Sequence, residues 1–271
     1  MNSTLITPSK GWKFVNLAEL WHYRDLLYFL TIRGIKGKYA QSILGVGWAI
    51  IQPLATTITF TIVFGRIAKV SSDGIPYSLF SYLGLWPWIY FSSTLTESSN
   101  SLVSNASMIT KVYFPRLVLP LSSVLSKLLD FVLGFAVLIA FLIYYKIVPG
   151  IGALYTPFFM IQLLFTSLGL GLILSAMAVQ YRDIRYAMTF LVQLLMYAAP
   201  VVYSTTAIPG RYQFWYSLNP MVGVIEGFRA GFLGKPIPWE WVLPGSFVSI
   251  ILFGFGLMYF RKMERLFADV A

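Results

Sequence analysis

The stretch KGKYAQSILGVGWAIIQPLATTITF, residues 36–60, passes within a few positions from a basic segment to a long apolar run. Gly45 and Gly47 weaken helix continuity at the boundary, and Trp48 is a residue type enriched at membrane interfaces. Pro53 leaves a backbone carbonyl without its helical partner, beside the amide of Gln52. Because lipid satisfies neither group, we predict a membrane-spanning helix whose beginning faces protein or a watery cavity.

The composition indicates a membrane protein with several spans. Of the 271 residues, 58% are hydrophobic and 11% are charged, and the mean hydropathy is +0.73. Soluble domains have roughly a quarter of their residues charged. The 20 Lys and Arg outnumber the 10 Asp and Glu but form no continuous basic module, so we expect no nucleic-acid partner. The chain has no Cys, which excludes disulfides and thiolate metal sites.

A span needs about 20 mostly apolar residues, and six segments meet that requirement. They are residues 48–68, 77–98, 117–145, 153–179, 186–203 and 240–260. The predicted fold is an all-α polytopic membrane protein with six transmembrane helices. It divides into an N-terminal segment, residues 1–40, and a transmembrane domain, residues 41–271. The first residues lack the apolar core of a cleavable signal peptide, so we expect the chain to stay intact.

The basic residues orient these spans. An even number of spans places both termini on one side, which then holds fourteen Lys and Arg residues against six on the other side. The fourteen are Lys10, Lys13, Arg24, Arg33, Lys36, Lys38, Lys111, Arg116, Lys127, Arg182, Arg185, Arg261, Lys262 and Arg265. The positive-inside rule therefore predicts that both termini are cytoplasmic.

Two further segments are apolar without being clear spans. In residues 16–33, helical spacing places Leu17, Leu20, Trp21, Leu27 and Tyr28 on one face, which predicts an amphipathic helix in the cytoplasmic interface. A soluble helix that packs on a partner is the alternative.

Residues 211–232 are interrupted by Asn219-Pro220, so they cannot form one straight spanning helix. We expect a re-entrant helical hairpin on the outer side, before the last span. Gly223, Gly227 and Gly231 repeat every four residues in it and favour close helix packing over a ligand site.

Several short patterns together resemble the transmembrane subunit of ABC-2-type polysaccharide exporters, which export O-antigen, capsule and teichoic acid chains. The patterns are Lys38-Tyr39, Ser42, Leu44-Gly45, Trp48, Pro53, Asn105, Lys111, Phe114-Pro115-Arg116, Pro120, Tyr181-Arg182-Asp183, Gln193, Pro200-Val201-Val202-Tyr203, Asn219-Pro220 and Arg229. No single piece is specific, but their order and spacing are, and they cover nearly the whole chain after residue 25.

The resemblance implies a homodimeric channel in the bacterial cytoplasmic (inner) membrane, in contact with membrane lipids, that exports a lipid-linked polysaccharide. It also implies two copies of a separate ATP-binding subunit. The chain itself lacks the phosphate-binding pattern G-x-x-x-x-G-K-[ST], because Gly37-Lys38 precedes Tyr39 and Gly234-Lys235 precedes Pro236. We therefore expect no ATPase site and no cofactor in this chain, with ATP and Mg bound by the partner.

Aromatic residues make up 17% of the chain and suit carbohydrate, because one face of a sugar ring is apolar. The resemblance, in which spans one and five line the conduit, assigns channel-lining roles to Trp48, Phe60, Phe64, Gln193, Met196, Tyr197 and Tyr203. Aromatic belts at the bilayer interfaces are the competing explanation for Trp86, Trp88, Trp215, Trp239 and Trp241.

The connection between the second and third spans, residues 100–116, is the candidate contact with the ATP-binding subunit, since the coupling helix occupies this loop in the exporters it resembles. The candidate residues are Asn105, Met108, Ile109, Lys111, Phe114 and Arg116, with Met108 and Ile109 as apolar anchors. The alternative is a solvated loop whose basic residues lie at the membrane surface.

Other charged residues have structural interpretations. Arg182 and Asp183 are expected to form a cytoplasmic clamp or a helix cap. Lys127 and Asp130, three residues apart, are expected to neutralise each other, as are Glu226 and Arg229; a role in transport is the alternative.

No catalytic or metal site is expected. The single His, His22, has no Cys or carboxylate pair beside it at ligand spacing. A polyprenol-handling enzyme would need clustered carboxylates or metal ligands, which the ten scattered acids do not supply. An ABC-2 exporter of drugs or lipids remains the main alternative to a polysaccharide exporter.

Overall fold

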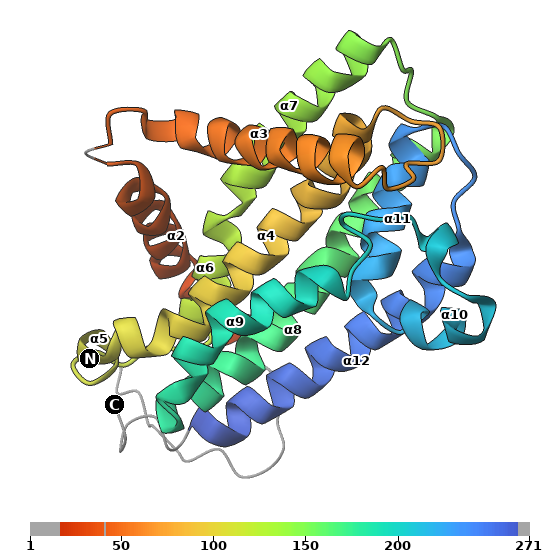
Figure 1. Cartoon of the computed structure of the whole chain (residues 1–271). Coiled ribbons are helices and arrows are strands. Elements are labelled where there is room, and N and C mark those ends of the chain that lie inside the picture. The colour runs from red at the N-terminus through yellow and green to blue at the C-terminus, as the bar shows by residue number, and fades with distance from the viewer. Residues whose placement is uncertain (1–16, 41, 265–271) are drawn as a thin grey trace.

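A computed structural model describes residues 17–40 and 42–264, and every regular element within these ranges is helical (Figure 1). The first half contains α1 (Leu17–His22), α2 (Arg24–Tyr39), η1 (Gly45–Gly47), α3 (Trp48–Phe60), the π-helix η2 (Thr61–Ile67), α4 (Tyr77–Ser104), α5 (Ala106–Ile109), α6 (Val118–Ser126) and α7 (Leu128–Tyr145). The second half contains η3 (Ile151–Tyr155), α8 (Thr156–Gln180), α9 (Asp183–Tyr197), η4 (Thr205–Ala207), α10 (Gly210–Ser217), α11 (Pro220–Phe232) and α12 (Trp239–Glu264). The all-α prediction is confirmed within the described ranges, whereas the expectations for residues 1–16 and Arg265 lie outside them.

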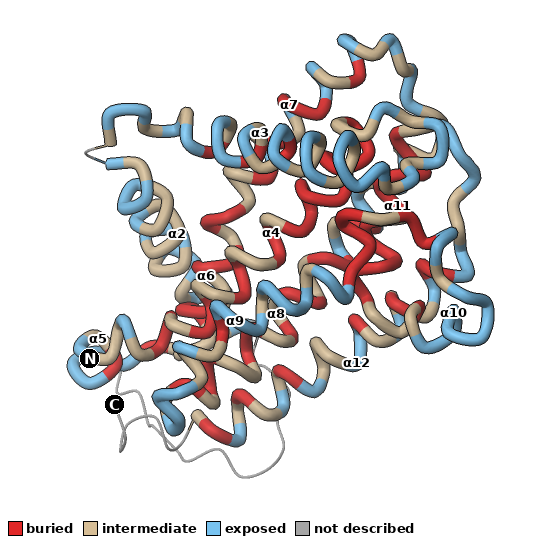
Figure 2. Tube along the Cα trace, in the orientation of Figure 1, coloured by how far each residue is buried: buried red, intermediate tan, exposed pale blue. Residues whose placement is uncertain are grey.

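Helix α4 forms the centre of the molecule, and most of its residues are buried (Figure 2). It contacts α8, α6, α11, α3, α7 and α9. Its aromatic side chains donate hydrogen bonds to backbone carbonyls of α6 and α7: Tyr82 to Gly134 (2.7 Å), Trp86 to Phe131 (2.9 Å) and Tyr90 to Val124 (3.1 Å). These bonds let large amphipathic rings fill the core without leaving a polar atom unpaired.

The buried position of α4 corrects the aromatic-belt interpretation for two tryptophans. Trp86 and Trp88 are each only 4% exposed, and the Trp86 ring stacks on Phe131 with centroids 4.2 Å apart. Their rings therefore belong to the core of the helix bundle and not to its rim. Sequence alone does not separate the two cases, because the same amphipathic ring suits either place.

Small residues set the close packing of α8, α11 and α12. A Cβ on Gly256 of α12 would lie 2.4 Å from the carbonyl oxygen of Gly169 on α8. On α11, a Cβ on Gly227 would lie 2.5 Å from the ring of Phe159. The predicted packing role of the glycine repeat in α11 is thus confirmed.

Four helical stretches in the described residues are long and apolar enough to cross a membrane. They are Gly45–Ile67, Val118–Tyr145, Ile151–Gln180 and Trp239–Glu264, and each overlaps one predicted span. The two other predicted spans correspond to α4 and α9. Helix α4 is long, but Ser, Thr, Tyr and Trp lower its mean hydropathy, whereas α9 has only 15 residues.

The fifth span was predicted to continue to residue 203, but α9 ends at Tyr197. Pro200 explains the difference, because it lacks a backbone N–H and disfavours helical geometry in the residue before it. The predicted break at Asn219-Pro220 is present, since α10 ends at Ser217 and α11 begins at Pro220 with the Asn219 side chain accepting from the Met221 N–H at 3.1 Å.

The N-terminal helices pack with a face that includes Leu20 and Leu27 of the predicted stripe but not its aromatic members. Trp21 and Tyr28 are 70% and 64% exposed, whereas Leu20, Leu26 and Leu30 contact a second, smaller apolar core. The buried residues of this smaller core are Leu102, Ile109, Phe114, Val118, Leu119, Leu172, Ala176, Phe260 and Met263. Helix α2 lies beside α6. The exposed aromatic side chains are free for a membrane surface or a partner, so both interpretations of this segment stay open.

Hydrogen bonds join loops and helix ends into two separate groups, one at each end of the molecule. At one end, Tyr113 donates to Glu19 at 3.4 Å, and the N–H of Arg116 donates to Glu264 at 3.3 Å. At the other, Ser204 donates to Asp73 at 2.6 Å. This grouping matches the two sets of loops assigned from the sequence to opposite sides of the membrane.

Candidate functional site

The predicted channel-lining residues lie on α3, η2, α9 and the segment after α9. Helices α3 and α9 both contact α4, which lies between them in Figure 1. Trp48 and Tyr197 are 48% and 59% exposed, and Gln193 is also exposed. The other four are partly buried against the larger apolar core, which includes Tyr82, Trp86 and Phe228; they are Phe60, Phe64, Met196 and Tyr203. The structure therefore places all seven on two helices that each contact α4, and on the continuations of these helices, without bringing them together in one cavity.

The aromatic members of this set contact each other in local pairs. The rings of Phe60 and Phe64 meet edge to face with centroids 5.3 Å apart, and Phe64 lies in the π-helix η2. The Tyr203 hydroxyl donates to the carbonyl of Tyr197 at 2.8 Å and shares a hydrogen bond of 2.9 Å with Tyr216. A π-helix at this place was not predicted; such turns are frequent at functional sites.

A cavity of about 30 Å³ lies where α2, α3, α4 and α7 meet. Its lining includes Ala49, Gln52, Pro53 and Ser93. Pro53 removes the N–H that would bond the carbonyl of Ala49, and the cavity is large enough for water. Ala49 and Pro53 are buried here, in agreement with the protein contact predicted for the beginning of the first span, whereas Gln52 is exposed.

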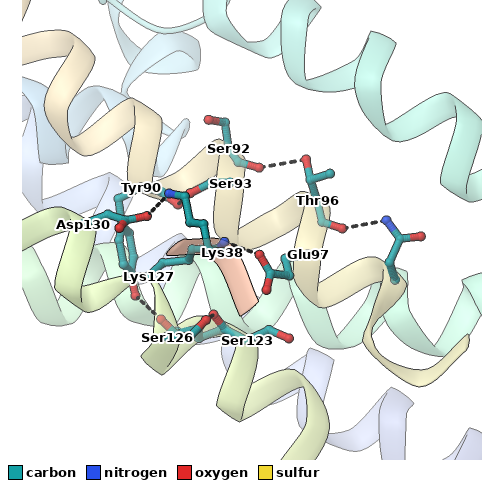
Figure 3. A network of polar contacts seen from close by, with 12 residues as sticks. Lys38, Tyr90, Ser92, Ser93, Thr96, Glu97, Ser123, Ser126, Lys127 and Asp130 are labelled. Atoms are coloured by element: carbon teal, nitrogen blue, oxygen red, sulfur yellow. Dashed lines mark hydrogen bonds and ion pairs between the residues drawn. The ribbon is translucent and has the colours of Figure 1, made fainter. Parts of the chain in front are cut away.

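Figure 3 shows two ion pairs near each other, and the residues of one of them, Lys38 and Asp130, line this cavity. Lys38 of α2 pairs with Asp130 of α7, and Tyr39 also donates to Asp130. Lys127 pairs with Glu97 of α4. Burial and the hydrogen bond to Asp130 raise the pKa of Tyr39 above its ordinary value, so its hydroxyl stays protonated and continues to donate.

These pairs correct the expectation that Lys127 and Asp130 neutralise each other. Lys127 lies between α6 and α7, and its side chain points to α4, whereas Asp130 points to α2 (Figure 3). Partners of opposite charge on other helices, Glu97 for Lys127 and Lys38 for Asp130, take the place of the pair within the segment. The other expected pair is present, with Arg229 Nη1 2.8 Å from Glu226 Oε1.

The candidate coupling residues form a compact turn of which only part is exposed. Ile109 and Phe114 are 8% and 4% exposed and pack into the smaller core with Leu102 and Val118. Met108 is partly buried against the same cluster. Ile109 therefore anchors the loop to its own bundle, which corrects the expectation that it projects towards a partner. Burial of its apolar side chain among other apolar side chains is more favourable than exposure to water.

The exposed apolar side chains of this loop are Val112 and Tyr113, at 58% and 72%, and the sequence analysis did not select them. Lys111 is also exposed. Asn105 accepts from Arg33 of α2 at 3.3 Å, and Arg116 donates to the backbone carbonyl of Glu264. The carboxylate of Glu19 raises the pKa of the Tyr113 phenol, which keeps its hydroxyl protonated. The loop thus ties α2 and the end of α12 together.

Arg182 and Asp183 are both exposed, and no ion pair joins them to each other or to another residue in the part of the chain that the structure describes. The clamp is therefore not formed. Asp183 is the first residue of α9, where a carboxylate favours the helix N-terminus, but no side-chain hydrogen bond caps this helix. Over residues 17–40 and 42–264, no three His, Asp or Glu side chains come together as metal ligands.

Comparison with known proteins identifies the class of this chain. Residues 25–233 match the model of the ABC-2 type transporter family. The chain is 31% identical over 256 residues to an O-antigen export system permease protein RfbA of Klebsiella pneumoniae, covering 94% of this chain and 97% of the relative. It is 31% identical over 257 residues to the protein of the same name from Myxococcus xanthus, covering 93% and 98%. It is 24% identical over 248 residues to the polysialic acid transport protein KpsM of Escherichia coli, covering 87% and 92%.

The chain belongs to the ABC-2 type transporter family, as a permease of its polysaccharide exporters. The resemblance found in the sequence is thereby confirmed. The four apolar helical stretches agree with a multi-pass membrane protein. Its relatives are named as export permeases and transport proteins.

Proposed function

We propose that this chain is the transmembrane subunit of an ATP-driven exporter that moves a lipid-linked cell-surface polysaccharide, such as O-antigen, across the inner membrane. The named functions of its relatives support the polysaccharide. The absence of a phosphate-binding loop from the sequence supports a separate source of energy. Two copies of an ATP-binding subunit, which carry ATP and Mg, would supply it.

The observation that carries this proposal is the open face of α3 and α9. On α3 only Ala49, Pro53 and Thr57 are buried, and on α9 only Met188 is buried. Both helices expose polar side chains, among them Gln52 and Gln193. Polar groups at membrane depth face protein or water in preference to lipid.

A second copy of the chain would cover this face. Most closed homo-oligomers are two-fold dimers, in which the same surface of each copy meets its counterpart. The two copies would enclose a conduit along α3 and α9, lined by Trp48, Phe60, Phe64, Gln193, Met196, Tyr197 and Tyr203. Aromatic faces suit a moving glycan because they offer apolar contact without fixed hydrogen bonds.

The ATP-binding subunits would dock at the end of the molecule that holds α5. Their contact would include Asn105, Lys111 and Arg116 from the predicted set together with the exposed Val112 and Tyr113. Residues 1–40 would form the adjoining interfacial segment. Because this end carries the excess of basic residues, it would be cytoplasmic.

Six spans would then cross the bilayer: α3 with η2, α4, α6 with α7, η3 with α8, α9, and α12. The buried helix α11 and the short α10 would re-enter from the outer side without crossing, since irregular backbone at membrane depth is tolerated only against protein. Both termini would lie in the cytoplasm.

The direct test is removal and complementation. A strain that lacks this chain should lose the polysaccharide from its surface and accumulate it inside, and the wild-type chain together with its ATP-binding partner should restore export. Normal surface polysaccharide with loss of lipid or drug efflux would contradict the proposal and favour an ABC-2 exporter of small molecules.

A further inference from the structure

The segment that follows α9, residues 198–206, is here called the outer loop. It is largely irregular yet well buried: Val201, Val202, Ser204 and Thr205 are all less than 7% exposed. Such a segment cannot rely on water for its backbone hydrogen bonds, so its carbonyls need donors from elsewhere.

Side chains of other elements supply these donors. Asn219, at the start of α11, donates to the carbonyl of Ala198 at 2.9 Å, and Tyr77 of α4 donates to that of Val202 at 2.7 Å. Arg229 donates to two carbonyls, those of Val201 at 3.0 Å and Tyr203 at 3.4 Å. Arg229 is therefore the one of these three side chains that holds the outer loop at two points.

The surroundings of Arg229 are built to hold a guanidinium. The residue is 3% exposed, lies 3.7 Å above the ring centroid of Phe80 and pairs with Glu226. A Cβ on Gly84 would lie 2.8 Å from Arg229 Nη2, so only glycine leaves room there. The planar fork of arginine can bond a carboxylate and two carbonyls together, which the point charge of lysine does less well.

The fixed outer loop in turn orients the side chain of Tyr203 and joins it to the backbone of Tyr197. Arg229 holds the backbone of Tyr203, whose hydroxyl donates to the carbonyl of Tyr197 at 2.8 Å. If Arg229 served only to neutralise Glu226, it would not need its hydrogen bonds to the carbonyls of Val201 and Tyr203. We propose that Arg229 is a positioning residue for export, which holds the outer loop so that Tyr197 and Tyr203 keep their places at the outer end of the conduit. This inference rests on the proposed function, which assigns both tyrosines to the conduit.

A cysteine reporter measures the position of the outer loop without any transport. The chain has no native Cys, and Val202 is 4% exposed, so V202C should react slowly with an impermeant maleimide added from outside. In R229M/V202C the rate should rise about tenfold or more, because two buried carbonyls lose their donor and local opening becomes easier. R229K/V202C should lie between the two, and export should fall in the same order.

Two controls separate release of the loop from general unfolding. Arg211 is an exposed arginine on α10, so R211M/V202C should label as slowly as V202C alone. Y77F/V202C removes a single donor and should raise the rate by about threefold, which provides a milder variant if R229M does not fold.

Unchanged labelling of V202C in R229M and R229K would overturn the inference, whatever the chain transports. Faster labelling with normal export by R229M and also by Y203A would instead contradict the proposed conduit, on which the inference depends. Faster labelling together with reduced export, in the order R229M, R229K, wild type, is the result that supports it.

Discussion

Lys38, near the end of α2, forms an ion pair with Asp130 of α7, 92 residues further along the chain. The pair joins the N-terminal helices to the third predicted span, beside the cavity at Pro53. The pair therefore fixes α2 to α7 beside the first residues of α3.

Loss of this pair should destabilise the protein. K38Q leaves the mostly buried Asp130 carboxylate without its cation, and we expect a loss of about 2 kcal/mol in unfolding free energy. The double variant K38Q/D130N should recover much of that loss, because it removes the unpaired charge. Thermal unfolding in detergent measures both. K36Q, at an exposed position on the same helix, is the matched control, and equal stability of K38Q and K36Q would show that the pair contributes nothing.

The loop after α5 should separate binding of the ATP-binding subunit from folding. V112D and Y113D change exposed side chains, so both variants should fold but each should weaken copurification of the partner by about tenfold or more. I109D places a charge in the smaller core and should lower expression and thermal stability first. Full binding by V112D and Y113D would locate the contact elsewhere, with the exposed aromatic residues of α1 and α2 as the next candidate.

Labelling of single cysteines should reveal the orientation of the two ends. S71C should react with an impermeant thiol reagent from outside intact cells, because Ser71 is exposed at the end that holds Asp73. S107C, at an exposed position in α5, should react only after the cells are opened. The reverse pattern would mean that the basic end faces outward, against the positive-inside rule.

Alanine variants should identify the aromatic lining. F60A, F64A, Y197A and Y203A should each reduce export several-fold while the complex assembles and hydrolyses ATP, because these side chains would contact the moving chain. F247A changes a side chain that is 66% exposed on α12 and should export normally. Equal, small effects at all five positions would indicate that the four aromatic residues face lipid.

Local sequence patterns predicted much of this fold. Hydropathy placed the first, third, fourth and sixth apolar stretches close to their observed bounds, and Pro220 marked the start of α11. These features depend on residues that are neighbours in the chain. The lost backbone hydrogen bond at Pro53 was predictable for the same reason, because a proline always removes one backbone donor.

The features that the sequence did not reveal depend on contacts between distant segments. Lys127 and Asp130 suggested a pair within one helix, but their partners, Glu97 and Lys38, lie on other helices. Ile109 was predicted to be an exposed anchor, but it is buried in the smaller core by residues from distant segments. Arg229 could be noted only as a charge, since its two carbonyl acceptors are 26 and 28 residues away.

The central claim is that two copies of this chain meet along α3 and α9 around a shared conduit. The most direct measurement is crosslinking of single-cysteine variants between copies, which is clean because the chain has no native Cys. Y197C, at an exposed position on α9, should form a covalent dimer with a short bifunctional maleimide in membranes, and the crosslinked complex should be blocked in export. F247C on α12 should remain monomeric under the same conditions. A dimer from F247C and none from Y197C would contradict the account.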